Sequence, residues 1–139
     1  MRIRRGAAGA VTALALAVTA GACGTPSPDL FVINRDGRVP GAKLTLLVSD
    51  TSVRCNNGPT RPLSSERTIE ARALTDDLLE FQSGSRLIST SGPAQIFTYS
   101  VRTEDGTVRY PDTAQRPDVL PRLTRFVRRT AIDVCGLKR

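Results

Sequence analysis

Residues 95–110 read QIFTYSVRTEDGTVRY and predict a β-hairpin. Phe97, Tyr99 and Val101 alternate with polar residues, which is the pattern of a strand that is buried on one side only. The dipeptide Asp105-Gly106 then accommodates the positive φ that a tight hairpin turn requires, and residues 108–110 form the returning strand. The chain is therefore expected to contain an antiparallel sheet with one side against a core.

Two further strands are expected nearer the N-terminus. Residues 30–33 are a short apolar run, and the composition of residues 34–37 predicts a turn after it. Residues 42–48 alternate again, with Leu44, Leu46 and Val48 on one side. The second strand is expected to continue through residues 53–55 until residues 56–59 break it.

Two helices are expected, one after these strands and one near the C-terminus. The first begins at Ser64 or Ser65, either of which can cap it, and ends at Gly84. Its apolar stripe comprises Ile69, Ala71, Ala73, Leu74, Leu78 and Phe81. The second begins at Pro117, and its stripe comprises Leu120, Leu123, Phe126, Val127, Thr130 and Val134. The expected fold class is therefore α+β in the order β-β-α-β-β-α, with a four-stranded antiparallel sheet that carries both helices on one face.

The N-terminus has the organisation of a signal peptide. Arg2, Arg4 and Arg5 form a basic start, and residues 6–20 follow without a charge. This uncharged stretch is shorter than the ~20 apolar residues of a transmembrane helix. We therefore expect a signal peptide over residues 1–22, a tether over residues 23–29 and a single α+β domain over residues 30–139.

The leader ends in Ala20-Gly21-Ala22-Cys23, which resembles the lipobox of bacterial lipoproteins. In that motif, small residues precede a cysteine that receives a diacylglyceryl group, and Leu is preferred where this chain has Ala20. The resemblance implies a lipid on Cys23 and a position on the extracytoplasmic face of the cell membrane. The same Ala-x-Ala spacing also fits cleavage by type I signal peptidase, which would leave Cys23 unmodified.

Cys55 and Cys135 are expected to form a disulfide. Lipidation of Cys23 leaves an even number of cysteines in an oxidising compartment. Neither of the two has the C-x-x-C neighbour of a redox motif. The alternative is a pair of buried free thiols.

The absence of histidine narrows the possible functions. Without His, the chain cannot use Ser-His-Asp or Cys-His catalysis or a His-ligated metal site. It also lacks the G-x-S-x-G, S-x-x-K, Walker and G-x-G-x-x-G motifs. Asp76, Asp77 and Glu80 can hold a hard cation weakly, or they form a solvated helix face in which Arg72 pairs with Asp76. We expect no enzyme, no cofactor and no metal.

The second helix carries a basic face made of Arg122, Arg125, Arg128 and Arg129. On a tethered protein this face can meet anionic lipid, where each arginine adds up to about 1 kcal/mol, or a partner protein. The alternative is an ordinary exposed side of an amphipathic helix. The net charge of +7 falls to +4 without the three arginines of the leader, which is too mild to predict nucleic-acid binding.

Four segments of the chain resemble the small lipoproteins of unknown function in high-GC Gram-positive bacteria. They are the leader through Cys23 and residues 44–56, 104–109 and 134–136. That resemblance implies no activity. Because an anchored, disulfide-bonded domain without catalytic groups is left, we expect a non-enzymatic binding domain at the cell surface. The element order, Asp36-Gly37 and residues 99–106 are also similar to emfourin, an inhibitor of thermolysin-like peptidases. This second resemblance implies the alternative function, a peptidase inhibitor-like domain at the cell envelope. The expected partners are the membrane, an envelope protein or a peptidase.

Overall fold

A computed structural model describes residues 29–137 of the chain. The predicted signal peptide over residues 1–22, Cys23 and almost all of the tether lie outside the described residues. The elements run in chain order as β1 Asp29–Gly37, β2 Leu44–Ser49, β3 Ser52–Cys55, β4 Thr60–Pro62, α1 Ser65–Gln82, β5 Leu87–Ser89, β6 Phe97–Arg102, β7 Thr107–Pro111 and α2 Val119–Asp133.

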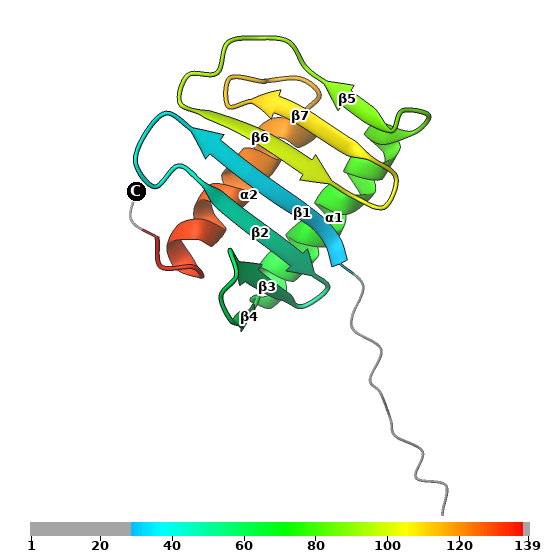
Figure 1. Ribbon diagram of the computed structural model, residues 1–139. Coiled ribbons are helices and arrows are strands. Elements are labelled where there is room, and N and C mark those ends of the chain that lie inside the picture. Colours follow the sequence, from blue (N-terminus) through cyan, green and yellow to red (C-terminus); the bar gives the residue numbers. More distant parts are fainter. Residues whose placement is uncertain (1–28, 138–139) are drawn as a thin grey trace, which may run out of the picture.

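A sheet of seven strands forms one layer, and both helices form a second layer against one of its sides (Figure 1). The strand order is β4-β3-β2-β1-β6-β7-β5, and all neighbouring pairs are antiparallel except β5 with β7. The predicted α+β class and the two helices on one face are present. The predicted four-stranded antiparallel sheet is wrong, because the sheet is mixed and has three more strands.

The three additional strands have weak sequence signals. β2 and β3 were expected to be one strand, but the chain reverses at Asp50-Thr51 so that Val48 lies opposite Val53. This turn contains no glycine and thus lacks the composition that marks most tight hairpins. β4 and β5 are three residues long, which is too short for alternation to show, and β4 contains Pro62.

The structure also corrects the turn that was predicted at residues 34–37. These residues continue β1, because all four pair with β6 and the first two, Asn34 and Arg35, also pair with β2. Gly37 is explained by close packing: a Cβ at this position would lie 2.6 Å from the Ile96 carbonyl oxygen. The connection to β2 instead uses residues 38–43, where Gly41 has a φ of 75°.

The core lies between the sheet and the two helices. Phe31 and Ile33 of β1, Leu44, Leu46 and Val48 of β2, and Tyr99 and Val101 of β6 are buried there. Ala71, Leu74 and Leu78 of α1 cover them, with Leu120, Leu123, Phe126 and Val127 of α2. These side chains account for most of the hydrophobic stabilisation, at roughly 25 cal/mol per Å² of buried apolar surface.

The predicted boundaries of α1 are close to those in the structure, but its apolar stripe is narrower. Ser64 caps the helix by accepting a hydrogen bond from the Arg67 N–H at 3.3 Å. Ile69 is 67% exposed and Ala73 is also exposed, which contradicts their assignment to the buried stripe. Each lies two residues from Ala71, about 200° around the helix, and therefore faces away from the sheet.

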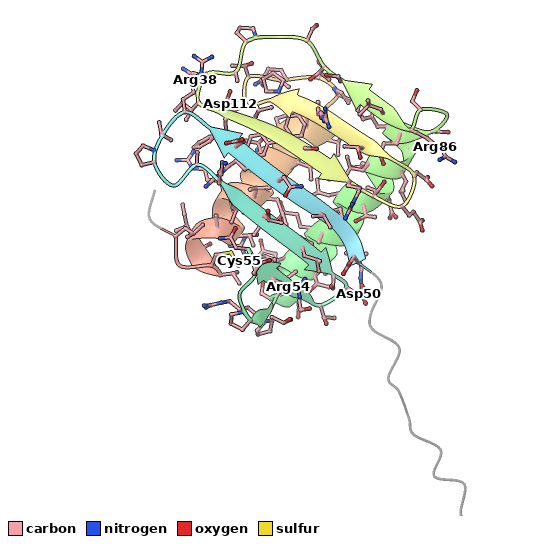
Figure 2. The ribbon with its side chains drawn as sticks, viewed as in Figure 1. Arg38, Asp50, Arg54, Cys55, Arg86 and Asp112 are labelled. Atoms are coloured by element: carbon pink, nitrogen blue, oxygen red, sulfur yellow. A yellow bond between two sulfur atoms is a disulfide. The ribbon has the colours of Figure 1, made fainter. Side chains whose placement is uncertain are left out.

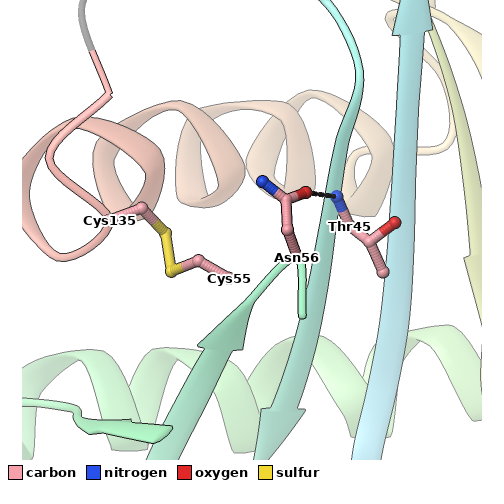
Figure 3. Close-up of a disulfide and its surroundings, with 4 residues drawn as sticks. All are labelled: Thr45, Cys55, Asn56 and Cys135. Carbon is pink, nitrogen blue, oxygen red and sulfur yellow. Dashed lines mark hydrogen bonds between the residues drawn. A yellow bond between two sulfur atoms is a disulfide. The ribbon is translucent and has the colours of Figure 1, made fainter. Parts of the chain in front are cut away.

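Cys55 and Cys135 form a disulfide, as expected (Figure 3). Cys55 ends β3, Cys135 follows α2, and their Cα atoms are 5.9 Å apart. Beside this bridge, Asn56 adopts a φ of 53° and its side-chain oxygen accepts a 3.0 Å hydrogen bond from the Thr45 N–H. The bridge joins the end of β3, a strand of four residues near one edge of the sheet, to the residue that follows the C-cap of α2. It therefore holds the C-terminal end of α2 against the part of the sheet that has short strands.

Replacing both cysteines with alanine should lower the free energy of unfolding by about 4.5 kcal/mol, because the bridge closes a loop with a sequence separation of 80 residues. Urea denaturation of the domain, with and without the substitutions, measures the loss. Reduction of the wild-type protein is the matched control and should give the same loss. Equal stability of the oxidised and reduced proteins would contradict this role for the bridge.

Candidate functional site

The four arginines of the predicted basic face divide into two pairs. Arg122 donates a hydrogen bond to Asp77 of α1. Arg129 donates to both carboxylate oxygens of Glu70, at 2.8 and 3.0 Å. These two arginines therefore fasten α2 to α1. Arg125 and Arg128 are exposed and have no carboxylate within 4.0 Å among residues 29–137.

The basic character of α2 is balanced by acidic residues of α1. The helix layer, meaning α1, α2 and Asp118, contains six arginines and seven carboxylates. The other described residues contain nine basic side chains and six carboxylates. A hollow of about 640 Å³ lies on the helix layer, lined by the four arginines with Glu70, Ile132 and Asp133. The excess positive charge therefore belongs to the strands and loops.

The expected ion pair between Arg72 and Asp76 is not formed; Arg72 pairs with another carboxylate. It donates two hydrogen bonds to Asp50 in the β2–β3 turn, at 2.6 and 2.8 Å. These bonds hold the pKa of Asp50 below its ordinary value. The sequence could not indicate this pair, because Asp50 is 22 residues away and meets α1 only after the sheet has formed.

The side of the sheet opposite the helices carries no covering element within the described residues, and Figure 2 looks onto this side. One cross-strand row on it runs through four neighbouring strands: Arg54 lies opposite Leu47, Leu47 opposite Val32, and Val32 opposite Arg102. The two arginines are exposed, and the two apolar residues between them are partly exposed. We call this side the open face.

A second row on the open face is polar. It runs from Thr45 through Asn34 and Ser100 to Arg109. The Thr45 hydroxyl donates a 2.8 Å hydrogen bond to the Asn34 side chain, and Arg109 is exposed. Within the described part of the chain, Arg54, Arg102 and Arg109 form no ion pair.

Sequence reasoning did not identify the open face, although its signal was present. The strand pattern assigned Tyr99 and Val101 to the core, and the intervening positions must then point to the other side. Arg102 and Arg109 occupy such positions on neighbouring strands, and Arg54 does so on β3. Only the strand pairing shows that these arginines share a surface, because they lie on three different strands.

Asp112 holds the loop that precedes β6. Its two carboxylate oxygens accept hydrogen bonds from the backbone N–H groups of Gln95, Ile96 and Phe97, at 2.8 to 2.9 Å. Burial alone would raise the pKa of Asp112, but the three donors outweigh it and lower the pKa below its ordinary value. This carboxylate has a structural role at one end of the sheet.

A second hollow, of about 760 Å³, lies between the end of α1 and the β6–β7 hairpin. The Thr103 hydroxyl donates to the Oε1 atom of Gln82, a buried residue that also lines this hollow. The Gln82 Nε2 atom has no partner and no access to solvent. Gln82 therefore ties the hairpin to α1, and its free donor does not point into accessible space.

Neither helix within residues 29–137 is long and apolar enough to cross a membrane. The same residues contain no group of three or more Cys, Asp or Glu side chains that could hold a metal ion. Comparison of the chain with protein-family models, with curated proteins and with solved structures finds no match.

The Asp112→Asn variant should be less stable than the wild type by about 1 kcal/mol at pH 6, because the neutral amide keeps one acceptor oxygen and replaces the other with an NH2 donor that cannot accept a backbone N–H. The wild-type pKa is lower in the folded state, so its contribution is complete above about pH 4 and is lost as the pH falls below that value. Unfolding measured between pH 2.5 and 6 checks both statements.

Asp76→Asn is the matched control for this experiment. Asp76 is exposed on α1 and forms no ion pair within residues 29–137. Its substitution should change the stability by less than about 0.5 kcal/mol. A difference between wild type and Asp112→Asn that stays constant down to pH 2.5 would contradict the role of the ionised carboxylate.

Proposed function

We propose that this protein is a non-enzymatic binding domain, exported from the cell and anchored to the outer side of its membrane by lipid on Cys23. The observation that carries the binding function is the open face, where apolar and cationic side chains remain uncovered on a sheet whose other side is fully packed. Binding surfaces commonly combine a small apolar centre with arginine and hydrogen-bonding groups around it.

The disulfide supports the compartment. Structural disulfides persist in oxidising environments outside the cytoplasm, and this one joins elements from distant parts of the chain. The leader supports export and Cys23 provides the site for lipid. A diacylglyceryl group has two acyl chains, which is what stable anchoring of a peripheral protein requires.

The Cys23→Ser variant should lose its membrane attachment and be released into the medium or periplasm. Intact-mass measurement of the wild-type protein extracted from membranes should show an acylated Cys23 and two fewer hydrogens for the Cys55–Cys135 bridge. Thr25→Ser, which alters a neighbouring side chain of the tether, should keep the lipid and the attachment. Recovery of wild-type protein from the medium with an unmodified Cys23 would contradict the anchor.

The second candidate function is inhibition of a peptidase at the cell envelope. The observation that favours it is the exposed connection between β1 and β2, where Val39 is 44% exposed. Arg35 braces this connection by donating to the carbonyl oxygens of Gly41 and Ala42, at 3.4 and 2.9 Å. Its guanidinium also lies 4.6 Å from the centre of the Phe97 ring. An exposed loop that is held in one conformation in this way is suited to enter the active-site cleft of a peptidase.

Incubation of the mature protein with metallopeptidases and serine peptidases tests this candidate. Inhibition should weaken by about tenfold or more in Val39→Asp, because a charge would then enter an apolar contact. Ile69→Asp, which changes an exposed apolar residue on α1, should inhibit like the wild type. Cleavage of the protein at residues 38–41 without inhibition would dismiss the candidate.

A further inference from the structure

The geometry of the open face points to a partner of defined chemistry. We propose that the row Arg54–Leu47–Val32–Arg102, together with Arg109, binds an acidic polypeptide segment that presents an apolar side chain between its carboxylates. This inference rests on the proposed binding function and adds to it the surface and the class of partner.

The spacing of the charges supports this class of partner. Arg54 and Arg102 are separated by three strand spacings of about 4.8 Å, or about 14 Å across the sheet. Arg102 and Arg109 are diagonal neighbours on β6 and β7, at about 7–8 Å. Carboxylates several residues apart on a polypeptide can reach both positions, and an apolar side chain between them would meet Val32 and Leu47.

The charge around this row favours an acidic partner. The two carboxylates of β1 on the same side, Asp29 and Asp36, lie toward opposite ends of the strand. Asp29 accepts a hydrogen bond from the Ser49 hydroxyl at 3.0 Å, and Asp36 accepts one from the Gly37 N–H at 2.8 Å. Both carboxylates lie at the margins of the row, and none of the three arginines forms an ion pair with them or with another carboxylate within residues 29–137.

A polypeptide fits better than an anionic polymer without apolar groups. Val32 and Leu47 are cross-strand neighbours at the centre of the row, so a wholly hydrophilic polymer would leave their apolar surface without a partner. Beyond Arg102, the strand pairing continues to Thr107 of β7 and then to Leu87 of β5, which is 61% exposed. The row therefore offers apolar contact at two places and positive charge beside each.

Site-specific photo-crosslinking of the full chain in intact cells tests the proposal. A benzoylphenylalanine probe replaces Leu47, and the crosslinked peptide is sequenced by mass spectrometry. The expected product is a polypeptide whose crosslinked segment has a net negative charge. Its yield should fall by about tenfold in Arg102→Glu/Arg109→Glu, because like charges across an interface weaken association. Arg125→Glu/Arg128→Glu, which changes two exposed arginines of α2, should keep the yield.

Three outcomes would overturn the proposal: a neutral or basic crosslinked segment, a product that is not a polypeptide, or a yield that is unaffected by Arg102→Glu/Arg109→Glu. The unfolding temperature of each variant, measured on purified protein, must match the wild type, so that a lost crosslink reports on the surface. Probes at positions 39 and 69 separate this proposal from the proposed function. A partner that crosslinks only at position 39 or 69 would support the proposed binding function but reject the open face as its site. The absence of a crosslinked partner at positions 39, 47 and 69 would reject both the binding function and the role of the open face.

Discussion

The burial of one side of the sheet under two antiparallel helices is the constraint on which this structure depends. Phe31 of β1 packs edge-on against Phe126 of α2, with ring centres 5.9 Å apart, and Leu74 and Leu78 of α1 complete the same core. Because side chains alternate along a strand, burying one set fixes the direction of the other set. The open face is therefore a direct consequence of the packing on the opposite side.

Electrostatic pairs between the helices follow the same constraint. The antiparallel arrangement places Arg67 beside Asp133, Glu70 beside Arg129 and Asp77 beside Arg122. These partly exposed pairs add little stability individually, but they pair three of the six arginines of the helix layer with carboxylates of the opposite helix. A helix that is strongly basic in sequence thus contributes to a layer with nearly balanced charge, and the sheet retains the positive excess.

The disulfide stabilises the part of the sheet around β3 and β4, which contributes few residues to the hydrophobic core. β3 and β4 are short, and β4 has no buried residue. The Cys55–Cys135 bridge, together with the hydrogen bonds between Asn56 and Thr45, fixes this part of the sheet to the end of α2. The open face extends onto β3 at Arg54, directly before the bridged cysteine, so the bridge also holds one end of the proposed binding row.

Much of the core was predictable, because its residues recur with the period of a strand or a helix. The alternation around Leu46 and Tyr99 and the spacing of Leu74 and Leu78 identified buried positions without a structure. The short strands were not predictable, since three residues show no period and gain their hydrogen bonds only beside an existing strand. Residues 34–37 resembled a turn by composition, yet pairing of all four with β6 made them part of β1.

The sequence by itself determined the α+β class, the two helices and the pair of cysteines available for a disulfide, because each of these depends on local composition or on counting. Only the tertiary structure decided which charges meet. Arg72 found Asp50 rather than Asp76, Arg122 and Arg129 were engaged by α1, and Arg54, Arg102 and Arg109 came to share one uncovered surface. These neighbours are distant along the chain, and strand pairing and helix packing alone bring them together.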